Sequence, residues 1–467
     1  MRRTFLSLSA LLLATAASAQ SPRTLLPGVQ RFVAVNAPVV ALTHVKLVDG
    51  TGTPAKDDQT IVITGDKITA VGKTGQVTIP AGATVQDRTG HTVIPGIIGL
   101  HDHLYYQQVM IYSYPKLFLA AGVTTIRTTG SRDSYQELNL QRQVTAGEVV
   151  GPEVFVTGPY VQGSGQAVGW MHPLKGGDEA RRLVKYWSEE GVNWFKAYTL
   201  VTREELGAAI EEAHKHGVKV TGHLCSVTFR EAVALGIDNL EHGLTTATEF
   251  RGGKELDKCP AGSGDTAYAA LDIKGPAVQQ TIREMIAKNV SLTSTLAVGE
   301  LSSPTRVPRD QRVLDALAPV YSQSVKNYYD SAQYRKDSLP RASMKKAMEF
   351  EREFVRQGGL MGAGSDPCCL SEVAGYGDQR NYELLVEAGF TAEQAIQIMT
   401  SNGAKILGIG DRTGSIVVGK EADLIVVQGD AVATPANVKN VSMVFANGLG
   451  YDPVKLTDAI KGRVGLQ

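Results

Sequence analysis

The chain contains little cysteine, few aromatic residues and no net charge. Its 467 residues include four cysteines, and 47 lysines and arginines balance 47 aspartates and glutamates. Four cysteines are too few for a disulfide-dense scaffold in a chain of this length. The balanced charge supplies no basic face for nucleic acid or an anionic membrane. We therefore expect a small-molecule or dipeptide substrate and no nucleic-acid partner.

The N-terminus has the pattern of an export signal. Arg2 and Arg3 precede an apolar stretch, and Ala17-Ser18-Ala19 forms a small-residue cleavage site before Gln20. The apolar stretch is too short to span a bilayer, and the absence of a cysteine near the cleavage point argues against a lipid anchor. We predict that residues 1–19 are a cleaved signal peptide and that the mature protein is periplasmic or secreted. The paired arginines are also typical of a twin-arginine signal, although an ordinary charged start has them too.

The cysteines leave two alternatives open. Cys368 and Cys369 are adjacent, so a bond between them would be strained. Either Cys259 pairs with one of these two, or all four cysteines, Cys225 among them, are free buried thiols.

Short apolar runs separated by turns occupy both ends of the chain. Residues 61–64 and 67–71 flank Gly65-Asp66, which is a two-residue hairpin pattern. Comparable runs near the C-terminus are 414–420, 422–427 and 441–446. We expect antiparallel strands from residues 36–94 and 406–450 to pair into one small β domain.

Strands and amphipathic helices alternate between these ends. The eight strand candidates are 93–100, 122–127, 153–158, 193–198, 218–223, 238–242, 291–297 and 360–365. Helices are expected over 203–213, capped by Thr202, and over 281–288. Eight strand–helix units predict an α/β fold, a (β/α)₈ TIM barrel over residues 95–405. Two long connections, about 244–275 and 299–345, are expected to wall or cover a functional site.

Six residues stand at the ends of these apolar runs, where a barrel strand points its side chains into the mouth. They are His101, His103, Lys196, His223, His242 and Asp366. His101 and His103 are two residues apart, so both side chains face the same way on a strand. Four imidazoles, one carboxylate and one lysine suit two divalent cations, above all Zn²⁺.

Lys196 and Asp366 have the most specific predicted chemistry. A lysine inside an apolar run is costly to bury, so it needs a reason to be there. A neutral buried amine can react with carbon dioxide, and the resulting carbamate would bridge two metals. Asp366 would be the last ligand and would move a proton from a metal-bridging hydroxide to the leaving amine. Since a bound metal lowers the pKa of water to about 7, these residues predict a metal-dependent hydrolase.

The chain resembles the amidohydrolase superfamily, and within it the imidazolonepropionase-like branch. The matching segments are 95–103 (PGIIGLHDH), Lys196, His223, 241–243, 365–366, 402–408 and 419–424. The resemblance implies a barrel with a β-sandwich, two divalent metals and hydrolysis at a carbonyl or phosphoryl centre. Members of this branch include binuclear Xaa-Pro, Xaa-Arg or Xaa-Lys dipeptidases and N-acyl amino acid amidases such as ochratoxin hydrolases, so we expect cleavage of an amide or peptide bond. It also implies a homo-oligomer, with an octamer as the assembly it suggests.

Weaker hypotheses concern single residues. By similarity to the dipeptidases, Tyr198 would stabilise the oxyanion, and a packed rim tyrosine is the alternative. Gly99 stands where many relatives have an acidic residue, so one possible partner for a metal-binding histidine is missing. His172, Arg251 and Lys254 could contact substrate, but an ordinary surface loop position explains each of them.

Two other functions compete with this interpretation. A mononuclear deaminase or a cyclic-amide, imidazolone-type hydrolase would leave Lys196 without a role. Many such relatives have a glutamate three residues after the histidine equivalent to His223, whereas Ser226 stands there in this chain. A catalytically inactive binding protein on the same fold would be expected to have lost a ligand, and none is lost.

Overall fold

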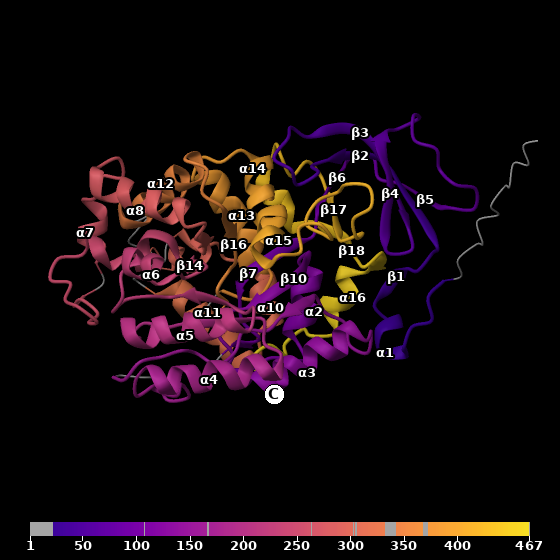
Figure 1. Cartoon of the computed structure of the whole chain (residues 1–467). Helices are drawn as coiled ribbons and strands as arrows, with labels where there is room; N and C mark the ends of the chain where they lie inside the picture. Colours follow the sequence, from indigo (N-terminus) through magenta and orange to yellow (C-terminus); the bar gives the residue numbers. More distant parts are fainter. Residues whose placement is uncertain are drawn as a thin grey trace, which may run out of the picture.

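The computed structural model describes residues 22–466 except 107, 166–167, 263, 302, 304–305, 332–341 and 368–371. The predicted signal peptide at 1–19 therefore lies outside the described residues, as do Cys368 and Cys369. An eight-stranded sheet and a nine-stranded sheet dominate the fold and lie beside each other (Figure 1). A two-stranded ribbon, β8 (Tyr105–Tyr106) and β9 (Gln108–Val109), adds a small third sheet.

The eight-stranded sheet confirms the predicted alternation of strands and helices. Its strands are β7 (Ile97–Asp102), β10 (Val123–Thr128), β11 (Glu153–Phe155), β12 (Trp194–Ala197), β13 (Lys219–Gly222), β14 (Asn239–Glu241), β15 (Ser291–Ser294) and β16 (Met361–Ala363). They lie in the order β11-β10-β7-β16-β15-β14-β13-β12, and each neighbouring pair is parallel. Each strand overlaps one of the eight predicted runs, so the α/β class with a parallel sheet is confirmed.

The strands β11 and β12 lie at opposite ends of the strand order of the parallel sheet. Backbone hydrogen bonds nevertheless join the segment that follows β11 to β12. The amide of Gly158 donates to the carbonyl of Trp194 (2.8 Å), and the amide of Val161 donates to the carbonyl of Lys196 (2.9 Å). The amide of Tyr198 donates back to the carbonyl of Val161 (2.9 Å). These bonds hold the backbone of Lys196 and Tyr198 beside the loop that follows β11.

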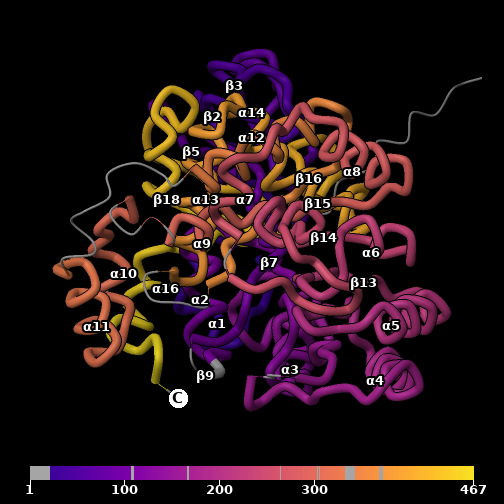
Figure 2. The backbone as a smooth tube through the Cα atoms, turned by 90° about the vertical axis from the view of Figure 1, so that its left-hand side faces the viewer, coloured from indigo at the N-terminus to yellow at the C-terminus, as the bar shows by residue number. Residues whose placement is uncertain are grey.

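Helices surround the parallel sheet in the view of Figure 2. They are α2 (Tyr114–Ala120), α3 (Ser134–Thr145), α4 (Gly177–Glu190), α5 (Arg203–Lys215), α6 (Phe229–Leu235), α8 (Pro276–Ala287), α12 (Ala342–Arg356), α13 (Tyr376–Glu387), α14 (Ala392–Gln397), the π-helical turn η4 (Ile398–Asn402) and α15 (Gly403–Leu407). The predicted cap of α5 is present, because the Thr202 hydroxyl accepts from the amide of Glu205 (3.2 Å) and the Glu205 carboxylate accepts from the amide of Thr202 (2.9 Å).

The two long connections contain short helices. The first holds η1 (Gly243–Thr246), η2 (Thr248–Phe250) and α7 (Asp265–Ala269), and the second holds α9 (Leu296–Glu300), α10 (Gln311–Ala316) and α11 (Pro319–Asp330). Among the described residues, no helix combines the length and the apolar character that crossing a bilayer requires.

Both ends of the chain build the nine-stranded sheet, which lies at the right of Figure 1. Its strands are β1 (Val33–Val35), β2 (Val39–Leu47), β3 (Lys56–Thr64), β4 (Lys67–Lys73), β5 (Thr84–Asp87), β6 (His91–Pro95), β17 (Leu424–Gln428), β18 (Val441–Ala446) and β19 (Leu449–Tyr451). The short helices α1 (Pro27–Gln30), η5 (Pro435–Lys439) and α16 (Pro453–Asp458) flank it in sequence. The β3–β4 hairpin around Gly65-Asp66 is confirmed. The sheet is mixed and not purely antiparallel, because β2 runs parallel to β5 and β6.

Two sequence expectations about strands were wrong in detail. The run 414–420 forms no strand, because Gly414 and Gly419 have left-handed φ values of 84° and 95° that interrupt an extended chain. The predicted strand 93–100 is two strands, β6 and β7, which belong to different sheets. Gly96 lies at the junction, where a Cβ atom would be 2.0 Å from Thr124 Oγ1, so only glycine fits this close approach.

Candidate metal centre

All six predicted ligands lie at one edge of the parallel sheet, at or just beyond the carboxyl ends of its strands. His101 is in β7 and Lys196 is in β12, while His103, His223 and His242 directly follow strands and Asp366 lies three residues beyond the end of β16. Five of them are buried and His223 is half-buried. The structure therefore brings together every residue that the sequence predicted as a ligand.

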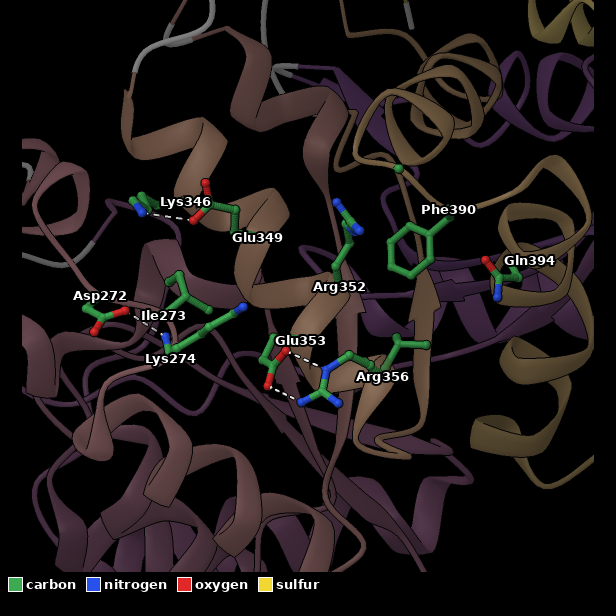
Figure 3. A pocket seen from close by; sticks show the side chains of 12 residues that line it. Asp272, Ile273, Lys274, Lys346, Glu349, Arg352, Glu353, Arg356, Phe390 and Gln394 are labelled. Carbon is green, nitrogen blue, oxygen red and sulfur yellow. Dashed lines mark hydrogen bonds and ion pairs between the residues drawn. The ribbon is translucent and has the colours of Figure 1, made fainter.

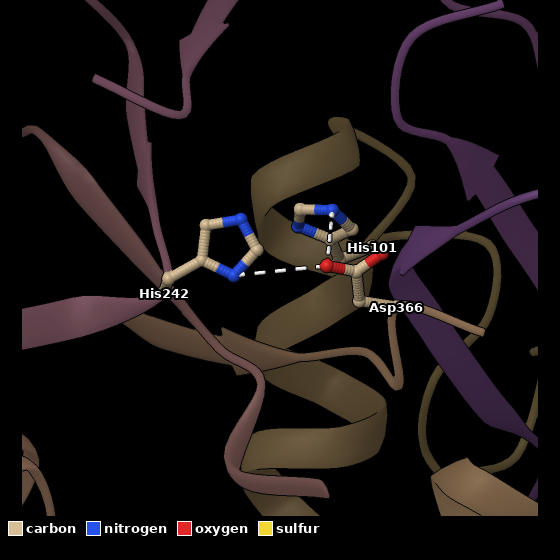
Figure 4. Close-up of side chains that lie close together, drawn as sticks. All are labelled: His101, His242 and Asp366. Atoms are coloured by element: carbon tan, nitrogen blue, oxygen red, sulfur yellow. Dashed lines mark ion pairs between the residues drawn. The ribbon is translucent and has the colours of Figure 1, made fainter. Parts of the chain in front are cut away.

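Asp366 lies in the middle of the histidines. Its Oδ1 is 3.1 Å from His103 Nε2, and its Oδ2 is 3.6 Å from His101 Nε2 and 4.0 Å from His242 Nδ1. Figure 4 shows the carboxylate between the rings of His101 and His242. One ligand atom from each of these three residues lies within 4.8 Å of the others, so the group could hold a metal ion.

Lys196 approaches the same cluster. Its Nζ lies 3.0 Å from His101 Nε2, and the residue is only 2% exposed. The same nitrogen lies 5.6 Å from the ring centre of Tyr160 and 5.7 Å from that of Tyr198. The amine is therefore held among imidazole and aromatic groups and away from solvent, the surroundings that its predicted chemistry requires.

His223 and Tyr198 extend the cluster beyond His242. The His223 ring centre is 4.3 Å from that of His242 and 4.9 Å from that of Tyr198. The amide of His223 donates to the carbonyl of Ala197 (3.0 Å), which ties the two neighbouring strand ends together. Tyr198 thus lies next to the candidate ligands.

The backbone is strained at two of the candidate ligands. His242 and Asp366 have φ values of 65° and 54°, in the left-handed region that residues other than glycine rarely adopt. Such conformations cost on the order of 1–3 kcal/mol each and cluster at functional sites. They are held by hydrogen bonds from the amide of His242 to the carbonyl of Thr293 (3.0 Å) and from the amide of Asp366 to the carbonyl of His101 (2.8 Å).

Glu241 and Arg127 support the ligands, and sequence reasoning missed both roles. Glu241 Oε2 accepts from His101 Nδ1 (2.7 Å), and Glu241 Oε1 accepts from Arg127 Nη2 (2.5 Å) and from the hydroxyl of Thr221. Because the ionised carboxylate can only accept, His101 carries its proton on Nδ1 and turns a lone pair on Nε2 toward Lys196. The sequence feature that could have revealed these roles is a charged residue within each of the apolar runs that form β10 and β14.

The pKa values favour a metal-binding state of these side chains. Burial lowers the pKa of all four histidines, to about 4 for His101 and about 3 for His242. Burial alone would raise the pKa of Asp366, but the charge of His101 and the hydrogen bond from His103 bring it well below its usual range. Burial likewise opposes ionisation of Glu241, yet the adjacent Arg127 and His101 lower its pKa. Neutral imidazoles beside an ionised carboxylate are the donor set of a zinc-like ion.

Two buried nitrogens in this cluster lack a hydrogen-bond partner within the described part of the chain: His103 Nδ1 and His242 Nε2. Leaving a buried polar atom unpaired costs about 1–3 kcal/mol, so native proteins rarely do it without a functional reason. The residues present therefore fit a bound metal in their chemistry, their protonation and their unmet bonding capacity.

Gly99 has a steric explanation that the sequence did not reveal. A Cβ atom on Gly99 would lie 1.7 Å from Asp102 Oδ2, so the Asp102 side chain occupies that space. Asp102 Oδ1 accepts from the hydroxyl of Ser365 (2.8 Å), which also contacts Asp378 (3.2 Å). An acidic side chain thus fills the space at Gly99 from a different position, and its hydrogen bond is with Ser365.

The three weaker candidates lie outside the cluster. His172 is exposed and pairs with Glu179 (3.0 Å). The Arg251 guanidinium donates to the carbonyls of Pro260 (3.0 Å) and Ala261 (2.9 Å) in its own loop. Lys254 Nζ donates to the carbonyl of Ser226 (2.7 Å). Arg251 and Lys254 therefore tie down the loop after β14, and none of the three has a contact that points to substrate.

The expected cysteine pairing was wrong. Cys259 forms a disulfide with Cys225, two residues after His223, and not with Cys368 or Cys369. The sequence alone could not show that the long loop after β14 folds back over the end of β13. The hydroxyl of Thr248 donates to the carbonyl of Cys225 (2.9 Å), so the loop is held at both points.

A surface cavity of about 620 Å³ lies away from this cluster and includes none of the six ligands. Figure 3 shows its lining, in which oppositely charged side chains pair: Lys346 with Glu349 (2.9 Å) and Arg356 with Glu353 (2.7 Å). Both pairs lie along helix α12, and we assign the cavity no catalytic role.

Known proteins support the architecture. A family model described as Amidohydrolase family matches residues 92–449. The chain belongs to the amidohydrolase family. A structure assigned as a prolidase from Bifidobacterium longum is 25% identical, covers 90% of this chain and 98% of that chain, and has a TM-score of 0.66.

Two further amidohydrolase structures show the same fold. A Xaa-Pro dipeptidase with bound methionine is 21% identical, covers 89% of this chain and 100% of that chain, and has a TM-score of 0.65. The ochratoxinase of A. niger is 16% identical, covers 88% and 94% of the two chains, and has a TM-score of 0.62. No curated protein matches the chain.

Proposed function

We propose that this amidohydrolase cleaves an amide or peptide bond, as a dipeptidase, a carboxypeptidase-like enzyme or an N-acyl amino acid amidase. The observation that carries the proposal is the gathering of six ligand-type residues from the ends of five strands at one sheet edge, with Lys196 Nζ 3.0 Å from His101 Nε2. Prolidase, Xaa-Pro dipeptidase and ochratoxinase structures of the same fold support this choice of bond.

In this proposal two divalent ions, most simply Zn²⁺, bind between the six residues. A carboxylated Lys196 would be the bridging ligand, because its amine is buried and adjacent to the cluster. We further propose that the parallel sheet is a closed (β/α)₈ barrel and that the nine-stranded sheet is the β-sandwich. The hydrogen bonds between β12 and the segment after β11 support closure.

Bound divalent ions would acidify water and polarise the scissile carbonyl. Asp366, ionised and 3.1 Å from His103 Nε2, would accept the proton of the attacking water and pass it to the leaving nitrogen. The hydroxyl of Tyr198 would donate to the carbonyl oxygen as negative charge develops there. Glu241 would keep His101 in the tautomer that presents Nε2.

One observation favours the mononuclear deaminase or cyclic-amide hydrolase as a second candidate. Among the described histidine, cysteine, aspartate and glutamate side chains, only His101, His242 and Asp366 lie close enough together, within 4.8 Å, to hold a single ion. That number would suffice for one metal with an open position. The close approach of Lys196 has no purpose in this alternative, so we rank it second.

The test is a hydrolysis screen of the purified mature protein on Xaa-Pro, Xaa-Arg and Xaa-Lys dipeptides and on N-acyl amino acids. We expect chelation to abolish hydrolysis and Zn²⁺ to restore it. His101→Ala should remove activity, whereas His172→Ala, which changes the exposed histidine paired with Glu179, should not. Hydrolysis that survives both chelation and His101→Ala would contradict the proposal. Inactivity on all these substrates, with ammonia release from an amino-substituted heterocycle, would favour the deaminase.

We also propose that the protein is exported by residues 1–19. The Cys225–Cys259 disulfide supports this assignment, because such bonds persist in oxidising compartments such as the periplasm. Intact mass of protein from the native host should start at Gln20. Retention of Met1 would contradict export with cleavage.

A further inference from the structure

A segment of the long loop after β14 is tied to the loops that follow two neighbouring strands, β12 and β13. We call residues 251–260 the strap. None of these residues belongs to a helix or a strand, so the path of the strap depends on its contacts with the rest of the chain. Cys259 is bonded to Cys225, just beyond β13. Asp257 accepts from the amide of Arg203 (3.0 Å) and from its guanidinium (3.0 and 3.3 Å), at the start of α5.

Several contacts meet at Cys225 and Ser226. Lys254 Nζ in the strap donates to the carbonyl of Ser226 (2.7 Å). The amide and the hydroxyl of Ser226 both donate to the carbonyl of Thr199, beyond β12 (2.9 Å each). A hydrogen bond of this kind contributes only about 0.5–1.5 kcal/mol, so it opens locally far more easily than a covalent bond. The disulfide is therefore the strongest restraint on the backbone two residues beyond His223.

His223 differs from two other candidate ligands in how its ring is held. His101 Nδ1 donates to Glu241 (2.7 Å). His242 Nδ1 lies 2.8 Å from the hydroxyl of Thr295. The His223 ring contacts neighbouring aromatic rings and has no hydrogen bond within the part of the chain that the structure describes. Since metal-binding histidines are almost always oriented by a hydrogen bond on the other ring nitrogen, the orientation of His223 depends on its backbone.

We propose that the Cys225–Cys259 disulfide positions His223, a task that hydrogen bonds perform for His101 and His242. By anchoring the strap to residue 225, the bond would keep the chain beyond β13 in the path that directs the His223 ring toward His242, 4.3 Å away between ring centres. This inference rests on the ligand role of His223 in the proposed function. Cys259 is exposed, so a small reductant can reach the bond from the strap side.

The first test follows the backbone around His223 in the metal-free protein, by hydrogen exchange and mass spectrometry. In Cys225→Ala/Cys259→Ala we expect the amides of residues 222–228 to exchange roughly tenfold faster than in the wild type, because a covalent restraint is lost. The amides of β7 should not change, since His101 keeps Glu241. Arg203→Gln is the matched control, because it weakens the other attachment of the strap and leaves the disulfide in place.

The second test is titration of the same proteins with Zn²⁺. The alanine double variant should lose affinity at one of two sites by roughly 10–100-fold, as when a supporting partner of a ligand is removed, and keep the other affinity. Arg203→Gln should keep both affinities. A disulfide that only stabilises the fold would lower Tm without changing either affinity. That result, with unchanged exchange at residues 222–228, would overturn the proposal.

Reduction of the folded wild type repeats the exchange measurement without a substitution, should the double variant fail to fold. A water-soluble phosphine converts the disulfide to two thiols and becomes its oxide with an oxygen atom from water. Faster exchange at residues 222–228 after reduction would support the proposal, and unchanged exchange would refute it. A wild type that binds a single ion or cleaves no amide would contradict the proposed function instead, and exchange in the metal-free protein would then decide the role of the disulfide by itself.

Discussion

The two sheets differ in what they bury. The parallel sheet encloses charged side chains, with Arg127 and Glu241 0% exposed and Lys196 2% exposed. The nine-stranded sheet has a hydrophobic core that includes Ile61 and Leu424, and the polar side chains buried in its strands, such as Thr60 and Thr92, carry no charge. Because a buried charge is costly unless it is paired, a fold keeps one only where it has a use. The comparison assigns chemistry to the parallel sheet and mechanical support to the other.

Lys196→Ala should have the largest effect on activity. It removes the group that would bridge the metals, so amide hydrolysis should fall by several orders of magnitude. Lys196→Arg should not restore it, because a guanidinium stays cationic and cannot form a carbamate. Steady-state kinetics of both variants test this, and near-wild-type hydrolysis by the arginine variant would return Lys196 to a structural role.

Arg127→Met should damage both stability and the site. It leaves Glu241 as a buried carboxylate without its cation, and breaking a buried pair in this way costs about 3–5 kcal/mol of unfolding free energy. Loss of such a supporting partner also weakens metal affinity by roughly 10–100-fold. Chemical denaturation and metal titration measure the two effects. Adding Glu241→Gln should recover part of the stability but not the affinity, and additive losses would contradict the pairing.

Leu424→Ala in the nine-stranded sheet should separate stability from activity. Leu424 is 0% exposed, and truncating a buried leucine costs about 2–5 kcal/mol. The kcat of the remaining folded protein should not change, because this residue touches no candidate ligand. A fall in kcat at temperatures well below the unfolding transition would show that the two sheets are coupled.

Glu351→Gln should produce the smallest effect, a change in pH dependence. Burial raises the pKa of Glu351 to about 8, against the hydrogen bond that it accepts from Ser294 (2.9 Å). The folded state therefore binds this proton more tightly than the unfolded state, so the stability is present below the ordinary value of 4.5 and declines as the pH rises toward about 8. The Tm of the glutamine variant should decline less across this range, and parallel Tm curves would contradict the assignment.

The sequence predicted the parts of the site that local pattern determines. His101, His223 and His242 end apolar runs, and alternating strands and helices bring such ends to one sheet edge wherever the strands are parallel. The pairing of Arg127 with Glu241 depends on which strands face each other across the sheet. The presence of a charged residue in each of two apolar runs therefore could not reveal it. The Cys225–Cys259 bond depends on the path of a long loop, which has no periodic pattern to read.

The sequence also could not show that the side chain of one residue fills the space beside another position. The absence of an acid at Gly99 suggested a lost partner, yet Asp102 occupies the same space from three residues further along. Tyr160 and Trp170 lie in irregular segments after β11, where no strand or helix period places side chains. Such segments take their positions from tertiary contacts, so the closeness of the Tyr160 ring to Lys196 Nζ became visible only in the folded chain.

Metal stoichiometry tests the central claim most directly. The claim is that six ligands, including a modified Lys196, hold two divalent ions. Elemental analysis of the mature protein, purified without chelator and supplied with bicarbonate, should find close to two ions per chain in the wild type. Lys196→Ala should bind fewer under the same conditions. One ion per chain in both proteins, unchanged by added metal and bicarbonate, would contradict the binuclear account and favour the mononuclear alternative.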